Sequence, residues 1–346
     1  MADSTMGSQE SAADKLVQVH DLRVHFRTGK GLETVKAVDG VDFDVRAGET
    51  FGIIGESGSG KSTLGRALVC LTKPTGGQLL HSGVDPYSLS SKALKNARRE
   101  FQIIFQDPSA ALDPRMTILR SVRQPLDILG DTDAAERSRL AFEAIDRVGL
   151  PAEYAQRYPH ELSGGQKQRV NIARALTLRP RLMVCDEVVA ALDVSIQADI
   201  LNLFSDLQRE FGLTYVFITH DLGVVSHVSD RIAVMYLGRF MEMGPADQVS
   251  ARPLHPYTQA LLSSEPVPLP SEMRTDRRII LEGEIPSPIS PPSGCRFRTR
   301  CRHAIDECAR TVPPWREIEP QRFIACHLAE QLAEQLAEQL AASPPD

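Results

Sequence analysis

The sequence lacks three features that would place it in common classes of protein. Its formal net charge is −6, so no chain-wide basic field favours nucleic acid as a partner. No apolar run approaches the roughly 20 residues that a membrane-spanning helix needs. Residues 1–14 are small and polar, unlike the basic start and apolar middle of a signal peptide. We therefore expect a disordered leader at 1–14 and a protein that stays in the cytoplasm.

The cysteines also lack a common pattern. Six are present, but no C-x-x-C pair occurs, and isolated disulfides are disfavoured in a cytoplasmic protein. Four of the six stand close together near the C-terminus, so they need another explanation. The remaining composition, with 42% hydrophobic residues in 346, suits a globular protein of about two domains, or one domain with an appendage.

The clearest motif is a glycine-rich loop, GESGSGKST, between an apolar stretch and a helix-like run. This is the strand–loop–helix setting of the P-loop, whose glycines let backbone N–H groups surround a phosphate. Lys61 can reach the β- and γ-phosphates, and the Ser62 hydroxyl can ligate Mg²⁺. A chance lysine in a flexible turn would not explain the flanking strand and helix. We predict a nucleoside triphosphate site formed by Gly55, Glu56, Ser57, Gly58, Ser59, Gly60, Lys61, Ser62 and Thr63.

Two adjacent carboxylates follow a second apolar stretch at 182–185. Asp186, at the end of a strand, can hold Mg²⁺ beside the P-loop, and Glu187 can then act as general base for a water. Adjacent acids are common in surface loops, so the pattern gains its meaning from the P-loop upstream. Together the two motifs predict hydrolysis rather than binding alone.

Three further positions have two interpretations from the residues alone. The segment 163–166 could cap the following helix or bind a second phosphate at the helix N-terminus. Phe26 could stack on a base or fill the core of an edge strand. His220 follows an apolar strand pattern and could equally be a solvated residue at the end of that strand.

The periodicity favours an α/β fold. Strands at 182–185 and 214–219, with a helix at 195–211 between them, indicate a mostly parallel sheet surrounded by helices. A strand–turn–strand at 16–26 and an alternating stretch at 35–45 indicate an antiparallel layer on that core.

Taken in order, the motifs resemble the nucleotide-binding subunits of ABC transporters over residues 16–250. The resemblance rests on the Walker A loop at 55–62, the Q-loop Gln106, the signature LSGGQ, the Walker B acids and the switch His220. It implies a P-loop ABC ATPase core with a mixed sheet at 15–250. An antiparallel β layer and an inserted helical subdomain at about 107–178 would complete the core.

The resemblance also implies an ATP sandwich between two subunits. Ser163 and Gly165 of one subunit, within the segment Ser163, Gly164, Gly165 and Gln166, would close on the γ-phosphate held by the other. Gln106 would sense Mg²⁺ and the attacking water, and His220 would contact the γ-phosphate. By the same resemblance, Phe26 becomes the expected base-stacking residue.

Two positions depart from the family pattern. Val188 stands where a proline usually follows the Walker B glutamate, and Ala190 stands where a serine usually opens the D-loop. The missing hydroxyl at Ala190 could weaken communication across the dimer. Asp193, in the same D-loop, remains a candidate at the nucleotide site. Since both carboxylates for phosphate chemistry are present, we still expect an active ATPase.

The C-terminal part resembles a branch of the same family. The segment HPYT at 255–258 is similar to that of oligopeptide/dipeptide importers, which carry an extension like the one at 251–328. By themselves the cysteines allow zinc, an iron–sulfur cluster or no metal. Their spacing resembles a segment that binds a [4Fe–4S] cluster in dipeptide importers, through Cys295, Cys301, Cys308 and Cys326. Arginines between them, at positions 296, 298, 300 and 302, are expected to lower the pKa of the thiols.

The resemblance implies the ATPase subunit of a peptide importer, peripheral on the cytoplasmic face of the inner membrane. Its partners would be a second ABC ATPase subunit, two transmembrane permeases and an external solute-binding protein, with no nucleic acid. Relatives handle nickel or oligosaccharides, so the solute stays open. A soluble ABC ATPase acting on nucleic acid or ribosomes, and a regulatory metal sensor, are the rivals. The LAEQ repeats at 329–346 predict a solvated helical tail.

Overall fold

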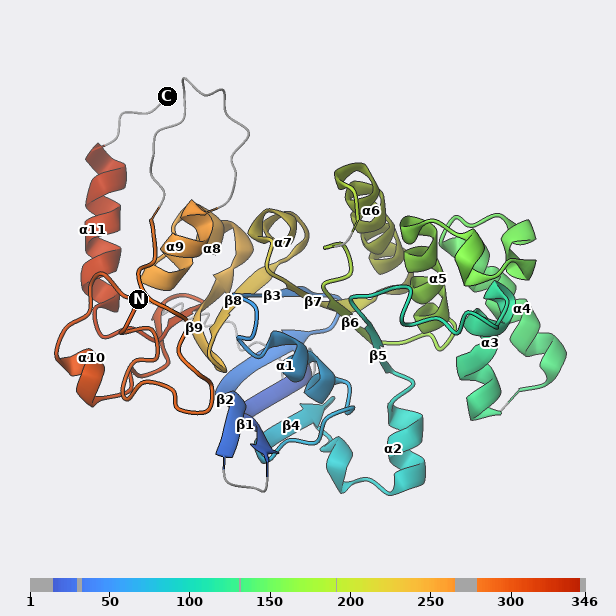
Figure 1. Cartoon of the computed structure of the whole chain (residues 1–346), viewed down its shortest axis with the longest axis horizontal. Coiled ribbons are helices and arrows are strands. Elements are labelled where there is room, and N and C mark those ends of the chain that lie inside the picture. The colour runs from blue at the N-terminus through green and yellow to red at the C-terminus, as the bar shows by residue number, and fades with distance from the viewer. Residues whose placement is uncertain (1–14, 30–32, 131, 191, 265–278, 343–346) are drawn as a thin grey trace, which may run out of the picture.

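The computed structural model describes residues 15–29, 33–130, 132–190, 192–264 and 279–342. The expected leader at 1–14 and residues 265–278 lie outside these residues. Within them, the strands form one eight-stranded sheet, in the order β10-β11-β9-β8-β3-β7-β6-β5, and one three-stranded sheet, in the order β2-β1-β4. Figure 1 shows the larger sheet running through the middle of the molecule, with helices above it.

The centre of the large sheet is parallel, as the alternation of strands and helices predicts. Its strands are almost entirely buried, which matches apolar segments covered on both faces. They are β3 (Thr50–Ile54), β5 (Phe101–Ile104), β6 (Leu182–Asp186), β7 (Thr214–Thr219) and β8 (Arg231–Tyr236). The strand β9 (Arg239–Pro245) returns antiparallel to β8 through a turn at Gly238.

The small sheet is the expected antiparallel layer, with one correction. Its first strand, β1 (Lys15–Thr28), is continuous, whereas the sequence predicts a strand, a turn and a strand. The predicted turn is an irregularity within the strand at residues 19–23, where Asp21 has a positive φ of 43°. The strands β2 (Glu33–Arg46) and β4 (Gly76–His81) pair on either side of β1. A buried apolar cluster joins this sheet to the large one, with α1 (Lys61–Leu68) between them.

Helices account for most of the segment 107–178 that was expected to be a helical subdomain. They are α3 (Ile118–Leu129), α4 (Ala134–Arg147) and α5 (Gly164–Leu176), with short 3₁₀ turns at Ala152–Gln156 and Pro159–Glu161. The exact limits of a subdomain stay a prediction. The helix α2 (Ser91–Ala97) lies below the sheet, and α6 (Val194–Phe211) and α7 (Leu222–Val228) lie above it (Figure 1).

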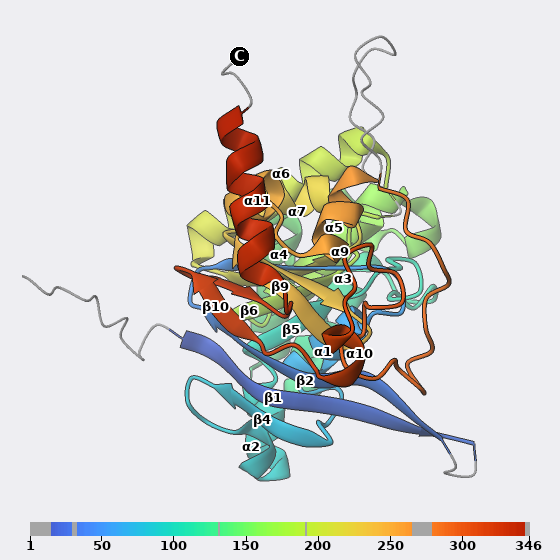
Figure 2. The ribbon, with the colours of Figure 1, turned by 90° about the vertical axis from the view of Figure 1, so that its left-hand side faces the viewer.

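The C-terminal extension packs against the cassette and continues its large sheet. After α8 (Ala246–Ala251) and α9 (Pro256–Ser263), it adds β10 (Arg316–Glu319) and β11 (Arg322–Ile324) to the edge of the large sheet. Figure 2 shows these strands and α11 (Ala329–Ala342), with the short α10 (Glu307–Arg310) lower on the same side. Residues 329–342 are helical, but the start of this helix is packed rather than solvated, since Ala329 and Leu332 are 0% and 6% exposed. The two added strands are a feature that the sequence patterns did not predict.

A fully buried ion pair joins the extension to the sheet. The Arg322 guanidinium donates to Glu242 over 2.6 Å, and both side chains are 0% exposed. The same carboxylate accepts hydrogen bonds from the backbone N–H groups of Leu254 and His255, at 3.0 and 2.9 Å. One acidic side chain of β9 thus binds both β11 and the segment that leads into α9.

Replacing Glu242 with alanine should therefore lower the free energy of unfolding by about 3–5 kcal/mol, because it removes the buried carboxylate from Arg322 and leaves only the more exposed Glu319, at 3.6 Å, as an ion-pair partner among the described residues. Glu330→Ala, which removes the partner of Arg316 at the surface, is the matched control and should cost at most about 1 kcal/mol. Urea unfolding of the full chain measures both values. Equal losses in the two variants would contradict the anchoring role of Glu242.

Candidate functional site

The candidate site lies at the edge of the large sheet where four parallel strands end. Ile54 of β3 pairs with Thr219 of β7, and Asp186 of β6 pairs with Ile218, so these strand ends are level. The residues that follow them, together with Gln106 after β5, are the ones that the sequence predicts for ATP chemistry. Ligands bind at such carboxyl ends in open α/β sheets.

The phosphate loop runs from β3 into α1, as predicted, and its shape depends on glycine. Gly60 has a φ of 108°, and a Cβ there would stand 2.0 Å from the backbone oxygen of Ala37. A Cβ at Gly55 would stand 2.1 Å from the backbone oxygen of Met235. Only glycine fits these two approaches, because any side chain would push the loop away from β2 and β8.

Lys61 is buried at the start of α1, with 4% of the residue exposed. Its Nζ donates to the backbone oxygens of Gly55 and Glu56, at 2.7 and 2.9 Å. Burial lowers the pKa of Lys61, while the carboxylates of Glu187, Asp186 and Glu56 oppose that shift. The ammonium group therefore lies inside the loop and close to the Walker B acids. A triphosphate bound there would compete with the loop carbonyls for the hydrogen bonds of Lys61.

The two predicted Mg²⁺ ligands, 124 residues apart in sequence, are in direct contact. The Ser62 hydroxyl donates to Oδ1 of Asp186 over 2.8 Å. Burial raises the pKa of Asp186, while the bond from Ser62 and the charge of Arg66 lower it. A hydroxyl and a carboxylate side by side suit Mg²⁺, which takes few protein oxygens and completes its shell with water and phosphate. These residues therefore fit the ion.

The three predicted catalytic residues meet at one carboxylate. Gln106 Nε2 donates to Oε2 of Glu187 over 2.7 Å, and His220 Nδ1 lies 3.6 Å from Oε1 of the same side chain. Glu187 has a φ of 51°, a conformation that is rare for a non-glycine residue. Strain of this kind is typical of functional sites and here directs the carboxylate toward Gln106 and His220.

A cleft of about 270 Å³ opens between the loop and these residues. It is lined by the loop from Ser57 to Thr63, by Gln106 and Glu187, and by Val35, Ala37 and Pro288. Phe26 is 44% exposed and therefore does not fill the core; it pairs across the strands with Val35, which lines the cleft. Its role in stacking on a base stays a prediction.

The signature residues cap a helix in this single chain. Ser163 Oγ accepts from the N–H of Gln166, and Gln166 Oε1 accepts from the N–H of Ser163 over 2.9 Å. A Cβ on Gly165 would stand 2.6 Å from Ile196, so this glycine allows α5 to approach α6. Gly164 and the exposed Asp193 also lie outside the described lining of the cleft. A phosphate role for these residues stays a prediction that requires a second subunit.

The cysteines of the extension lie near one another, but the expectation that arginines lower the pKa of these thiols overall is wrong, because burial outweighs the lowering effect that Arg302 has on Cys301. Burial raises the pKa of Cys295 to about 11 and that of Cys326 to about 12, and neighbouring thiols add to both shifts. Burial also raises the pKa of Cys301. Two of the arginines are paired with carboxylates of the cassette instead: Arg296 with Asp39 and Arg300 with Glu56.

The cysteines show no arrangement around a single metal ion. Cys295 and Cys308 are buried, and the N–H of Cys295 donates to the backbone oxygen of Cys308 over 2.8 Å. Across the described residues, no three side chains among His, Cys, Asp and Glu are grouped to hold a metal ion. No described helix is long and apolar enough to cross a membrane.

Comparison with known proteins identifies the class to which the site belongs. A family model described as "ABC transporter" matches residues 38–190, and one described as "Oligopeptide/dipeptide transporter, C-terminal region" matches residues 241–308. YkfD of Bacillus subtilis, named a putative oligopeptide transport ATP-binding protein, is 52% identical over 315 residues, which cover 90% of this chain and 95% of YkfD. The chain belongs to the ABC transporter family.

Other relatives and solved structures agree with this assignment. AppF of Bacillus subtilis, an oligopeptide transport ATP-binding protein, is 49% identical over 94% of this chain and 99% of its own length. A dimeric ATP-binding cassette bound to ADP and Pi has a TM-score of 0.59 at 32% identity, covering 66% of this chain and 98% of that one. For cbiO1 of Clostridium perfringens the values are 0.61 and 29%, covering 69% and 92%. These structures confirm the ABC cassette fold, and the ABC ATPase assignment implies ATP and Mg²⁺.

Glu187→Gln should lower the rate of ATP hydrolysis by this ABC ATPase about 100-fold or more, because the amide cannot take a proton from water. ATP binding should persist, since the phosphate loop is unchanged. The control is Glu153→Gln, which alters an exposed glutamate outside the lining of the cleft. Its carboxylate lies 3.7 Å from the Arg157 guanidinium. Phosphate release and binding of a fluorescent ATP analogue measure the two properties. Undiminished hydrolysis in Glu187→Gln would remove this residue from the role of base.

Proposed function

We propose that this chain is the ATP-hydrolysing subunit that powers import of peptides through an ABC transporter. The observation that carries the proposal is the match of residues 241–308 to the oligopeptide/dipeptide C-terminal region. Relatives at about half identity over nine-tenths of the chain are named for oligopeptide transport or, in Brucella ovis, for peptide import. The corresponding part of this chain packs on the cassette beside the phosphate loop, so it belongs to the same working unit.

The chemistry follows from the strand-end residues. Lys61 would exchange its bonds to the loop carbonyls for bonds to the β- and γ-phosphates. Ser62 and Asp186 would hold Mg²⁺, with Gln106 nearby, and the ion would neutralise charge on the phosphate oxygens. Glu187 would take a proton from the attacking water, and His220 would contact the γ-phosphate. Gln106 and His220 already lie at the Glu187 carboxylate, which supports their roles in orienting it.

The complete site requires partners. Ser163, Gly165 and Asp193 lie away from the cleft, which supports closure against a second ABC ATPase subunit, with each chain completing the other's site. Two transmembrane permeases and an external solute-binding protein would form the rest of the importer. The chain would then sit peripherally on the cytoplasmic face of the inner membrane. Nickel or oligosaccharides are the alternative solutes, and a soluble ABC ATPase acting on nucleic acid is the rival class.

Uptake by the reconstituted transporter tests this function. The complex is purified with its permeases from detergent-solubilised membranes and placed in vesicles with internal ATP and the solute-binding protein outside. We expect labelled di- or oligopeptides to accumulate, and Glu187→Gln to abolish accumulation. Nickel and an oligosaccharide of similar size are the matched competitors. Recovery of the chain with ribosomes or nucleic acid, and not with permeases, would overturn the importer proposal.

The cysteine segment is proposed to hold a [4Fe–4S] cluster with a structural role. Zinc–thiolate bonds of about 2.3 Å would place several sulfurs around one ion, an arrangement that the described residues do not show. A four-iron cluster is a larger body and spaces its thiolates more widely. Four buried or half-buried thiols that influence one another support this assignment. Cys295, Cys301 and Cys308 pack with the large apolar cluster of the cassette, and Cys326 packs against the small cluster of Leu254, Ile324 and Ala329.

Cys301→Ser should therefore remove most of the iron and acid-labile sulfide from anaerobically purified protein. The control is Cys70→Ala, at the end of α1 and outside the cysteine segment, which should keep the full metal content. Visible absorbance detects the cluster, and elemental analysis measures the iron and zinc content. Zinc in the unmodified protein, or full iron after the Cys301 change, would reject this assignment.

A further inference from the structure

Within the described part of the chain, the hydrogen bonds between the C-terminal extension and the phosphate loop all involve Glu56. The Arg300 guanidinium donates to both carboxylate oxygens of Glu56, at 2.7 and 3.1 Å. The backbone N–H of the same residue donates to the Tyr257 hydroxyl over 2.9 Å. Both partners belong to the extension, more than 200 residues further along the chain. Sequence analysis did not predict these contacts, although Tyr257 lies in the HPYT segment that it singled out.

The charge of Glu56 makes this contact relevant to ATP. A carboxylate within the phosphate loop would repel a triphosphate, and Glu56 lies near enough to Lys61 to influence its pKa. The side chains of Arg300 and Glu56 are only 8% and 22% exposed, so water and salt screen them weakly. The two-bond geometry places the positive charge of Arg300 directly on this carboxylate.

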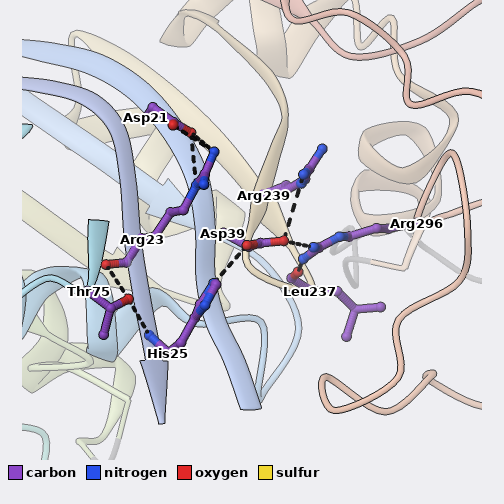
Figure 3. A network of polar contacts seen from close by, with 8 residues as sticks. All are labelled: Asp21, Arg23, His25, Asp39, Thr75, Leu237, Arg239 and Arg296. Carbon is purple, nitrogen blue, oxygen red and sulfur yellow. Dashed lines mark hydrogen bonds and ion pairs between the residues drawn. The ribbon is translucent and has the colours of Figure 1, made fainter. Parts of the chain in front are cut away.

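Further contacts hold the extension against the cassette close to the phosphate loop. Arg296 donates to Asp39 on β2 and to the backbone oxygen of Leu237, as Figure 3 shows. Burial alone would raise the pKa of Asp39, but Arg296, with His25 and Arg239, holds that pKa below its usual value. The backbone oxygen of Pro288 accepts from the N–H of Lys36 over 3.2 Å, and Pro288 itself lines the cleft.

We propose that Arg300 is a positioning residue for ATP, which neutralises Glu56 and fixes the phosphate loop, so that the C-terminal extension is part of the nucleotide site. Arg300 acts through Glu56 and does not touch the nucleotide. The proposal rests on ATP binding by this subunit and not on the identity of the solute. Its failure is therefore distinguishable from failure of peptide uptake.

Equilibrium binding of a fluorescent ATP analogue to the full chain tests the proposal. Arg300→Met, which keeps the length of the side chain and removes its charge, should weaken binding about tenfold. Arg300→Lys should lose less affinity than Arg300→Met, because it keeps the charge but cannot donate both hydrogen bonds to Glu56. Arg298→Met is the matched control, since the described hydrogen bonds of the Arg298 side chain are donated to Ser293, which also belongs to the extension. In steady-state hydrolysis, KM should rise in Arg300→Met while kcat changes little.

A double variant separates the electrostatic effect from general damage to the fold. Removing the unpaired carboxylate in Glu56→Gln/Arg300→Met should recover much of the affinity that Arg300→Met loses. Such recovery shows that methionine at position 300 is compatible with a folded nucleotide site. Two results would overturn the proposal: unchanged affinity in Arg300→Met, or a double variant that binds as weakly as Arg300→Met alone.

Discussion

The whole site depends on the level ending of parallel strands at one edge of the sheet. Because β3, β6 and β7 pair in register, the phosphate loop, the Walker B acids and the switch histidine emerge side by side. This brings a buried ammonium, Lys61, close to two carboxylates, Asp186 and Glu187, of which Asp186 is also buried. Opposite charges held in such surroundings are ready to exchange partners with a phosphate and a metal ion.

The C-terminal extension also contributes to this edge of the sheet. Its strands lengthen the large sheet, and Glu242 is the buried point at which sheet and extension are joined. From this anchored position the extension reaches the phosphate loop through Arg300 and Tyr257, and Pro288 forms part of the cleft. The cleft beside the phosphate loop is therefore lined by residues of both the cassette and the extension.

Local patterns predicted the parts of the structure that depend on neighbouring residues. The phosphate loop, the parallel strands, the antiparallel layer and the residues around Glu187 all follow from short motifs and periodicity. Other features depend on contacts between distant segments and leave no local pattern. Glu56 and Arg300 are 244 positions apart, and the arginines beside the cysteines look like a thiol-activating group until their carboxylate partners are known. The sequence predicts a turn near Asp21, but the structure has only a local irregularity there. Asp21 adopts a turn-like φ, while the strand on either side of it stays paired with β2.

Hydrogen–deuterium exchange of the full chain, with and without Mg²⁺ and a non-hydrolysable ATP analogue, tests the central claim most directly. If the cassette and the extension form one nucleotide site, ligand binding should slow exchange in the phosphate loop and also around Tyr257 and residues 296–302. Exchange in the distant helix α4 serves as the internal reference. Slowed exchange confined to the loop, with the extension unchanged, would contradict this account.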